Sequence, residues 1–205
     1  MKVLRHEFLY YELCTMNFSN RTVLSLIAGL VLSFVIVPFS ESKTQSDDLS
    51  RIIAAFVYHI SKFVTWPDSS SDSLNNPLKL CILAQGEASL LQQFSELRSK
   101  KAQGRTIQVI AFDNKQKLSR HIEVDGPCHI LFASNGEWNE FTHSEIKRLR
   151  ASTLLIGKSR HFLEGGGMMS LIQVESKIRI FLNPESMAQS QIKLESRLRS
   201  LARTL

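Results

Sequence analysis

The sequence contains few cysteines and lacks the residue clusters that mark nucleic-acid or dithiol chemistry. Its 205 residues include three cysteines, at positions 14, 81 and 128, and no two of them have the C-x-x-C spacing. The formal charge is +6, and much of the excess lies near the end of the chain, at Lys193, Arg197, Arg199 and Arg203. No aromatic residue lies among these basic residues. A nucleic-acid surface combines a basic face with aromatics or a docking motif, so we expect a solvated basic face and no nucleic-acid partner.

The motifs of hydrolysis and nucleotide binding are missing as well. The sequence has no G-x-S-x-G and no H-E-x-x-H. Residues 157–159 read Gly-Lys-Ser after a predicted strand, but Ser152 stands where a phosphate-binding loop needs its first glycine. The glycines at 165–167 could bring the backbone close to a ligand, although a tight turn with positive φ is the favoured interpretation. The sequence therefore predicts no enzyme and no cofactor.

The histidines do not form a metal motif. Those that follow the apolar segment near the N-terminus lie at 59, 121, 129, 143 and 161, and none pairs with another at i, i+4. His129 is next to Cys128 on a predicted strand, where neighbouring side chains point to opposite faces. No metal ligands are assigned.

Near the N-terminus, residues 22–39 are uncharged and almost wholly apolar, with Arg21 before them and a polar stretch after. This pattern predicts that residues 1–42 are a leader and signal peptide, cut before Lys43. Met16 is an alternative start, because the leader before the apolar segment is long for a bacterial signal. An uncleaved inner-membrane anchor is the other interpretation, since 18 apolar residues are near the lower limit for a span. In both cases we expect residues 43–205 in the periplasm.

Residues 43–205 predict one α/β domain. Apolar residues recur every three or four positions from Leu49 to Val64, which indicates a helix of about twenty residues that Ser46 caps and the Trp-Pro pair at 66–67 ends. Four strands are expected at 78–83, 106–112, 128–133 and 153–157, with helices at 88–101 and 137–150 between them. An antiparallel hairpin at 168–182 and a long last helix from Asn183 follow. The fold class is a mixed, mostly parallel sheet with a C-terminal hairpin, flanked by helices of which the first and last are long.

Several blocks in this order resemble the YfiR family of periplasmic proteins. They are AAFVYHISKFVTWP at 54–67, LKLCIL at 78–83, CHILF at 128–132, GGGMM at 165–169 and IRIFLN at 178–183. The resemblance covers about residues 50–204. It implies a regulator: the family's named member represses a membrane-bound diguanylate cyclase by binding its periplasmic sensory part, which lowers cyclic di-GMP. The implied partner is the periplasmic domain of a diguanylate cyclase or of a histidine kinase, and family members also form homodimers.

The resemblance also implies a disulfide between Cys81 and Cys128 near the starts of neighbouring strands; two small buried thiols are the alternative. For partner contact the aromatic residues at the end of the first helix are candidates, namely Tyr58, Phe63 and Trp66. Trp66 is preferred because it falls just outside the helix, whereas Phe63 continues the inner stripe. The second functional interpretation is a small-ligand-binding module with a pocket between the sheet and the glycine loop, and an enzyme is the third.

Overall fold

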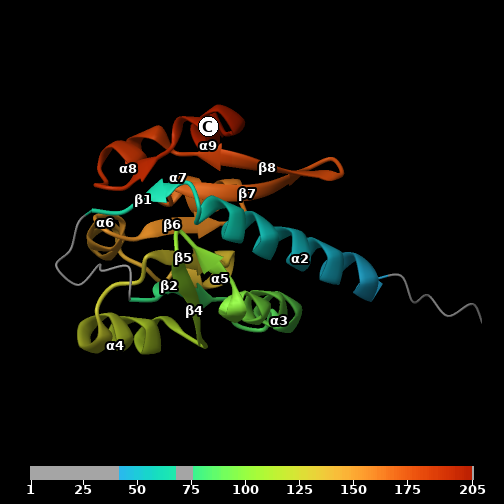
Figure 1. Ribbon diagram of the computed structural model, residues 1–205, viewed down its shortest axis with the longest axis horizontal. Helices are drawn as coiled ribbons and strands as arrows, with labels where there is room; N and C mark the ends of the chain where they lie inside the picture. Colours follow the sequence, from blue (N-terminus) through green and yellow to red (C-terminus); the bar gives the residue numbers. More distant parts are fainter. Residues whose placement is uncertain (1–41, 68–75, 205) are drawn as a thin grey trace, which may run out of the picture. The chain divides into compact units, whose positions relative to one another are not determined.

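The computed structural model describes residues 42–67 and 76–204 (Figure 1). The predicted leader and signal peptide, with the alternative start at Met16, therefore lie outside the described residues except at Ser42. Residues 43–205 form one compact unit. None of the described helices is long and apolar enough to cross a membrane.

A mixed sheet forms the centre of this unit, with the strand order β10-β8-β7-β6-β5-β2-β4-β3 among the described residues. The strands are β2 (Leu78–Leu83), β3 (Lys101–Ala102), β4 (Arg105–Phe112), β5 (Ile130–Ala133), β6 (Leu154–Gly157), β7 (Met169–Val174), β8 (Lys177–Leu182) and β10 (Arg203–Thr204). The five strands from β4 to β7 along this order are mutually parallel. Strands β7 and β8 form an antiparallel hairpin that ends in the pair Val174↔Lys177. The predicted mixed, mostly parallel sheet with a C-terminal hairpin is confirmed.

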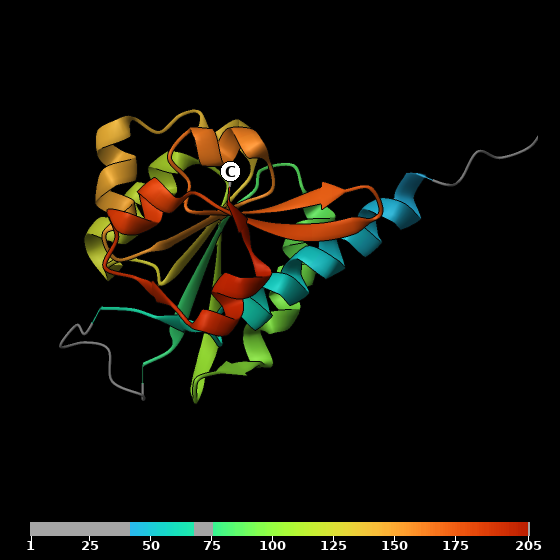
Figure 2. The same ribbon diagram turned by 90° about the horizontal axis from the view of Figure 1, so that it is seen from above.

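The helices lie on both faces of the sheet. They are α2 (Ser42–Ile60), α3 (Ala88–Ser95), α4 (Lys115–Asp125), α5 (Asn135–Trp138), α6 (His143–Arg150), α7 (Arg160–Glu164), α8 (Pro184–Ala188) and α9 (Ser196–Leu201), and a 3-10 turn at Glu96–Ser99 extends α3. Figure 2 shows α2 beside α3 on one side of the sheet and α6 and α7 on the other.

The alternation of side chains along β5 and β2 accounts for the two layers. Phe132 of β5 packs against Phe94 of α3, with ring centroids 5.0 Å apart. Cys81 of β2 has Leu131 as its register partner, one residue from Phe132, and therefore faces the opposite side, where α4 lies. The central strands are covered on both faces, which explains why β2 and β5 are almost continuously apolar.

The first helix differs from the expectation at both ends. It has 19 residues, close to the predicted length, but it begins at Ser42, so Ser46 lies inside it and does not cap it. It ends at Ile60, before the Trp-Pro pair. The chain then turns and forms β1 (Val64–Thr65), which pairs antiparallel with β9 (Lys193–Leu194).

The prediction of a long last helix is wrong. Asn183 does cap a helix, because its side-chain oxygen accepts a hydrogen bond from Ser186 N at 3.0 Å, and Pro184 follows at the first position. That helix, α8, has only 5 residues, and the chain continues through β9 to the separate helix α9. Ile192 and Leu194 are buried, as the helical pattern required, but Leu194 lies in β9, paired with β1, and Ile192 lies in the connection before it. Pairing with a distant strand overrides the weak local helix preference.

Two further helices depart from the sequence prediction. The polar run after β4 contains α4, which Asn114 caps by accepting a hydrogen bond from Lys117 N at 2.9 Å. The helix expected at 137–150 is two helices, α5 and α6. Thr142 and Glu145 form a capping box at the start of α6. The pKa of the Glu145 carboxyl is lowered to about 2. The largest cause is the Lys115 ammonium, 2.8 Å away, and hydrogen bonds from Thr142 lower the pKa further.

Candidate functional site

The first helix presents an apolar edge that the domain leaves partly uncovered. The buried side of α2 includes Ile53, Val57 and Ile60. Next to it, Leu49 and Phe56 are half-buried, and Ile52 has 44% of its surface exposed. At 3.6 residues per turn these three residues form one row along the helix, which we call the α2 ridge. Most exposed side chains of a surface helix are polar, so an apolar ridge is a candidate contact surface.

The predicted anchor Tyr58 is half-buried and lies on another side of α2. It is two positions from Phe56, and therefore almost opposite it around the helix axis. Its hydroxyl donates to Lys101 O of β3 at 3.2 Å, and the Lys62 ammonium lies 4.1 Å from its ring centroid. Gln103, in the turn after β3, donates to Ser61 O and Val64 O at 2.8 and 2.7 Å. Tyr58 thus helps to fix the end of α2 against the β3–β4 hairpin.

Phe63 and Trp66 flank the short strand β1. Phe63 is half-buried, and its carbonyl accepts a hydrogen bond from Glu195 N at 3.0 Å. Trp66 is buried, with 8% of its surface exposed. Its indole N–H donates to His129 O at 2.8 Å, and its ring meets the His129 ring edge-on at 5.5 Å. A partner-binding role for the three aromatic residues stays a prediction. Tyr58 and Phe63 are more exposed than Trp66, whereas the sequence had favoured Trp66 as the contact residue.

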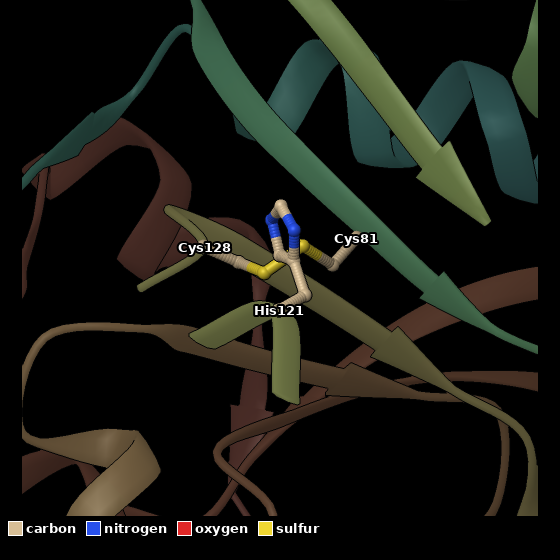
Figure 3. Close-up of side chains that lie close together, drawn as sticks. All are labelled: Cys81, His121 and Cys128. Atoms are coloured by element: carbon tan, nitrogen blue, oxygen red, sulfur yellow. A yellow bond between two sulfur atoms is a disulfide. The ribbon is translucent and has the colours of Figure 1, made fainter. Parts of the chain in front are cut away.

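Cys81 and Cys128 are joined by a disulfide, as the resemblance implied. Cys128 lies just before β5, while Cys81 is the fourth residue of β2, so only one end is near a strand start. Their Cα atoms are 6.0 Å apart, which is ordinary for a disulfide, and both side chains are buried. The bond ties two adjacent central strands. Figure 3 shows the ring of His121, from α4, standing over the two sulfur atoms.

A pocket of about 350 Å³ opens at the amino ends of β2 and β5. Its lining includes Trp66, Lys79, Arg105, Asp125, Cys128 and His129. Arg105 is buried and donates to Asn76 O and Pro77 O at 2.8 and 3.1 Å. Its guanidinium also lies 2.8 Å from His129 Nε2, while Lys79 N–H donates to His129 Nδ1 at 3.0 Å. His129 therefore organises this edge of the sheet, and the sequence analysis had assigned it no role.

The strand order reverses between β2 and β5. In such folds the usual ligand crevice lies at this point, outside the carboxyl ends of the strands. Here α5 fills it. The buried carboxylate of Glu137 accepts hydrogen bonds from Gln85 N, at 2.8 Å, and from the hydroxyl of Ser134. These contacts join the segment that follows β2 to the segment that follows β5.

The glycine block is explained by packing and by one turn. Gly166 has φ +89°, which confirms the predicted positive-φ turn at this position. Gly167 has a different reason to be glycine: a Cβ there would lie 2.1 Å from Cε1 of Phe162. A Cβ at Gly157 would lie 2.2 Å from the same ring, which also packs 4.5 Å from the Trp138 ring. The glycines thus make room for a buried phenyl ring, and this observation gives no support to a ligand loop.

The sequence reasoning did not place His121 beside the two cysteines, where it lies in the structure. Its Nδ1 lies 2.9 Å from Oδ2 of Asp125, one helical turn on, and its ring packs 5.2 Å from Phe112. Its Nε2 is buried and has no hydrogen-bond partner among the residues that the structure describes. The cap residue Asn114 was the available signal, because it reveals α4 and hence the side of α4 that faces the sheet.

The comparisons with known proteins give one family match. The model of the YfiR/HmsC-like family matches residues 50–203. This range contains the whole sheet except the last residue of β10, both cysteines of the disulfide and the glycine block. No curated protein matches the chain.

Proposed function

Because the chain belongs to the YfiR/HmsC-like family, we propose that it is a periplasmic regulatory protein that binds the external domain of a membrane-bound signalling enzyme of the diguanylate cyclase type. The family match over residues 50–203 carries the proposal. The export pattern of the sequence and the disulfide support it, since disulfides persist in oxidising compartments such as the periplasm. The proposed activity is protein binding, with no catalytic step.

Regulation of this kind requires unequal binding to two states of the enzyme. A regulator that binds both conformations equally shifts nothing, and a shift from mostly active to mostly inactive needs a preference of about 10⁴-fold. The preference comes from contact area that exists in one state only. The α2 ridge suits such a contact, because Leu49, Ile52 and Phe56 add apolar surface on one continuous helix. Tyr58 lies on the other side of the helix, so a contact through Tyr58 or Phe63 would be separate from the ridge.

Capture from intact cells tests the proposal. The full chain, with a C-terminal tag, is expressed in its own bacterium, cross-linked in the periplasm and purified with its bound membrane proteins. Recovery of a diguanylate cyclase or a histidine kinase through its external domain is the expected result. A cross-linked species that contains only this chain would indicate a homodimer, which could compete with the partner for the same surface.

A pair of matched variants separates the ridge from general effects of surface charge. Ile52→Glu places a carboxylate on the α2 ridge, and Val124→Glu places one on α4, where Val124 is 76% exposed. We expect Ile52→Glu to lose the captured partner and Val124→Glu to retain it, because desolvating an unpaired charge opposes binding at a contact. Retention of the partner by both variants would remove the α2 ridge from the proposal and leave the regulator function standing.

The pocket beside His129 supports a second candidate, a module that binds a small anion. Lys79 and Arg105 contribute cationic side chains to its lining. Failure to capture any membrane protein, with the protein folded and abundant, would favour this candidate over the regulator. Thermal unfolding with and without a panel of small carboxylates and phosphates would then test it, since a ligand that binds only the folded state raises the melting temperature.

A further inference from the structure

We infer that Cys81, Cys128 and His121 form a zinc-binding site when the disulfide is reduced. The two Sγ atoms and a ring nitrogen of His121 all lie within 4.8 Å of one another. A tetrahedral zinc ion, with bonds of about 2.3 Å to sulfur and about 2.0 Å to nitrogen, spaces its ligands about 3.5–3.8 Å apart. Once the two sulfurs are no longer bonded, rotation about the Cα–Cβ bonds of the cysteines can move them apart toward this spacing. The fourth position is left for a water molecule.

The surroundings of His121 are those of a metal ligand. Zinc-bound histidines usually donate their second ring N–H to a carboxylate, which fixes the tautomer and raises the basicity of the ligand nitrogen. Here Nδ1 lies 2.9 Å from Oδ2 of Asp125, so in the neutral ring this contact favours the tautomer with the proton on Nδ1 and the lone pair on Nε2. This Nε2 is buried and has no hydrogen-bond partner among the described residues. A disulfide offers it no donor, whereas a zinc ion would satisfy it.

Charge and access both favour the site. Two thiolates and a neutral imidazole give a zinc complex with no net charge, which a buried position tolerates far better than an isolated ion. Cys128 and Asp125 both line the pocket at the amino ends of β2 and β5, so the site lies next to that pocket. The metal would bridge β2 and β5 where the disulfide bridges them now.

The chemistry proceeds in two balanced steps. A dithiol reductant gives two electrons and two protons to the Cys81–Cys128 bond, which leaves two thiols and the oxidised dithiol as its own disulfide. Zinc then replaces both thiol protons, so each bound ion releases two protons to the solvent. The site forms only in the reduced protein, because the disulfide leaves no thiolate to bind zinc.

Zinc titration of the purified full chain tests the inference. One sample is reduced with a phosphine, which is then removed, and a second sample stays oxidised. Each is titrated with Zn²⁺ in competition with a chromophoric chelator. We expect one zinc ion and two released protons per chain in the reduced protein, and no uptake in the oxidised protein. Co²⁺ should give thiolate-to-metal charge-transfer bands in the reduced protein only. Equal uptake by both samples, or cobalt spectra without those bands, would overturn the site.

Variants identify the nitrogen ligand. His121→Ala should weaken zinc binding by at least about tenfold, and Asp125→Asn by about 10–100-fold, the range for a residue that orients a ligand. His143→Ala is the matched control, because His143 is exposed on α6, and its affinity should equal that of the wild type. Equal affinities for His121→Ala and His143→Ala would refute the role of His121. If His121→Ala does not fold, alkylation of the wild type decides: zinc must protect both cysteines of the reduced protein, and unprotected cysteines would contradict the site.

Discussion

Adding one methyl group at Gly167 should destabilise the protein through Phe162. The new Cβ would lie 2.1 Å from Cε1 of the phenyl ring and 2.7 Å from the carbonyl oxygen of Phe162, whereas carbon atoms in contact are normally about 3.5–4.0 Å apart. The ring cannot retreat, because it is fully buried and packs 4.5 Å from Trp138. Overpacking of this kind costs about 1–3 kcal/mol. For a domain of this size that is a fall in melting temperature of about 2–4 °C per kcal/mol.

A double-mutant cycle tests whether the ring is the cause. Phe162→Ala alone should lower the free energy of unfolding by about 3–5 kcal/mol. In that background much of the cost of Gly167→Ala should disappear, which gives a coupling energy of about 0.5–3 kcal/mol from denaturant titrations. The residual cost comes from the Phe162 carbonyl, which both backgrounds contain.

Gly104 provides the control for backbone strain. It has φ +78°, and no atom lies within 4 Å of a Cβ built there. Gly104→Ala should therefore cost about 1–2 kcal/mol from the left-handed conformation alone, equally with and without Phe162. If Gly167→Ala and Phe162→Ala were additive, as Gly104→Ala and Phe162→Ala should be, the packing explanation of the glycine block would be refuted.

Three other predictions concern the cross-link, a charged pair and a helix cap. The double variant Cys81→Ala/Cys128→Ala should have a free energy of unfolding about 4 kcal/mol lower than that of the oxidised protein, because the bond closes a loop with a sequence separation of 47. An unchanged denaturation midpoint would contradict this. The pKa of Glu145 is held at about 2, chiefly by Lys115, so its contribution is present above pH 4.5 and is lost as the pH falls toward 2. Glu145→Gln should remove that pH dependence and lower the free energy of unfolding by about 1 kcal/mol. The loss is small because the pair is partly exposed, and denaturation at several pH values would measure it. Asn183→Ala should cost about 1 kcal/mol in thermal unfolding, and no loss would show that the cap of α8 is dispensable.

The sequence predicted best those elements whose own apolar pattern shows which side chains are buried. The bounds of β2 agree residue for residue, because an uninterrupted apolar run such as Leu78–Leu83 fits a strand covered on both faces. The hairpin of β7 and β8 was also predicted, from its alternating pattern. Where few side chains are buried the signal was too weak: α4 buries only Leu118 fully among its residues, and it was missed.

The remaining differences come from pairing over long sequence distances. Val64 and Leu194 fit the apolar stripe of a helix, but each lies in a short strand that exists because of the other. A pattern of three- and four-residue spacing cannot report on a partner more than a hundred positions away. Part of the candidate site was beyond prediction for the same reason. His121 approaches the two sulfurs through the packing of α4 on β2, and Trp66 is buried because His129 accepts its indole hydrogen bond.

The β1–β9 ribbon also imposes an order on folding. Its register pair Val64↔Leu194 joins distant positions of the chain, so β1 cannot pair with β9 until Leu194 has left the ribosome or the translocon. Contacts between such distant residues form late, because the closure entropy of the loop must be overcome before they give any gain. In a growing or partly exported chain the end of the first helix would thus be held only by its contacts with the β3–β4 hairpin, through Tyr58 and Gln103. The β1–β9 ribbon therefore forms late in folding, and a chain truncated before Lys193 would lack it.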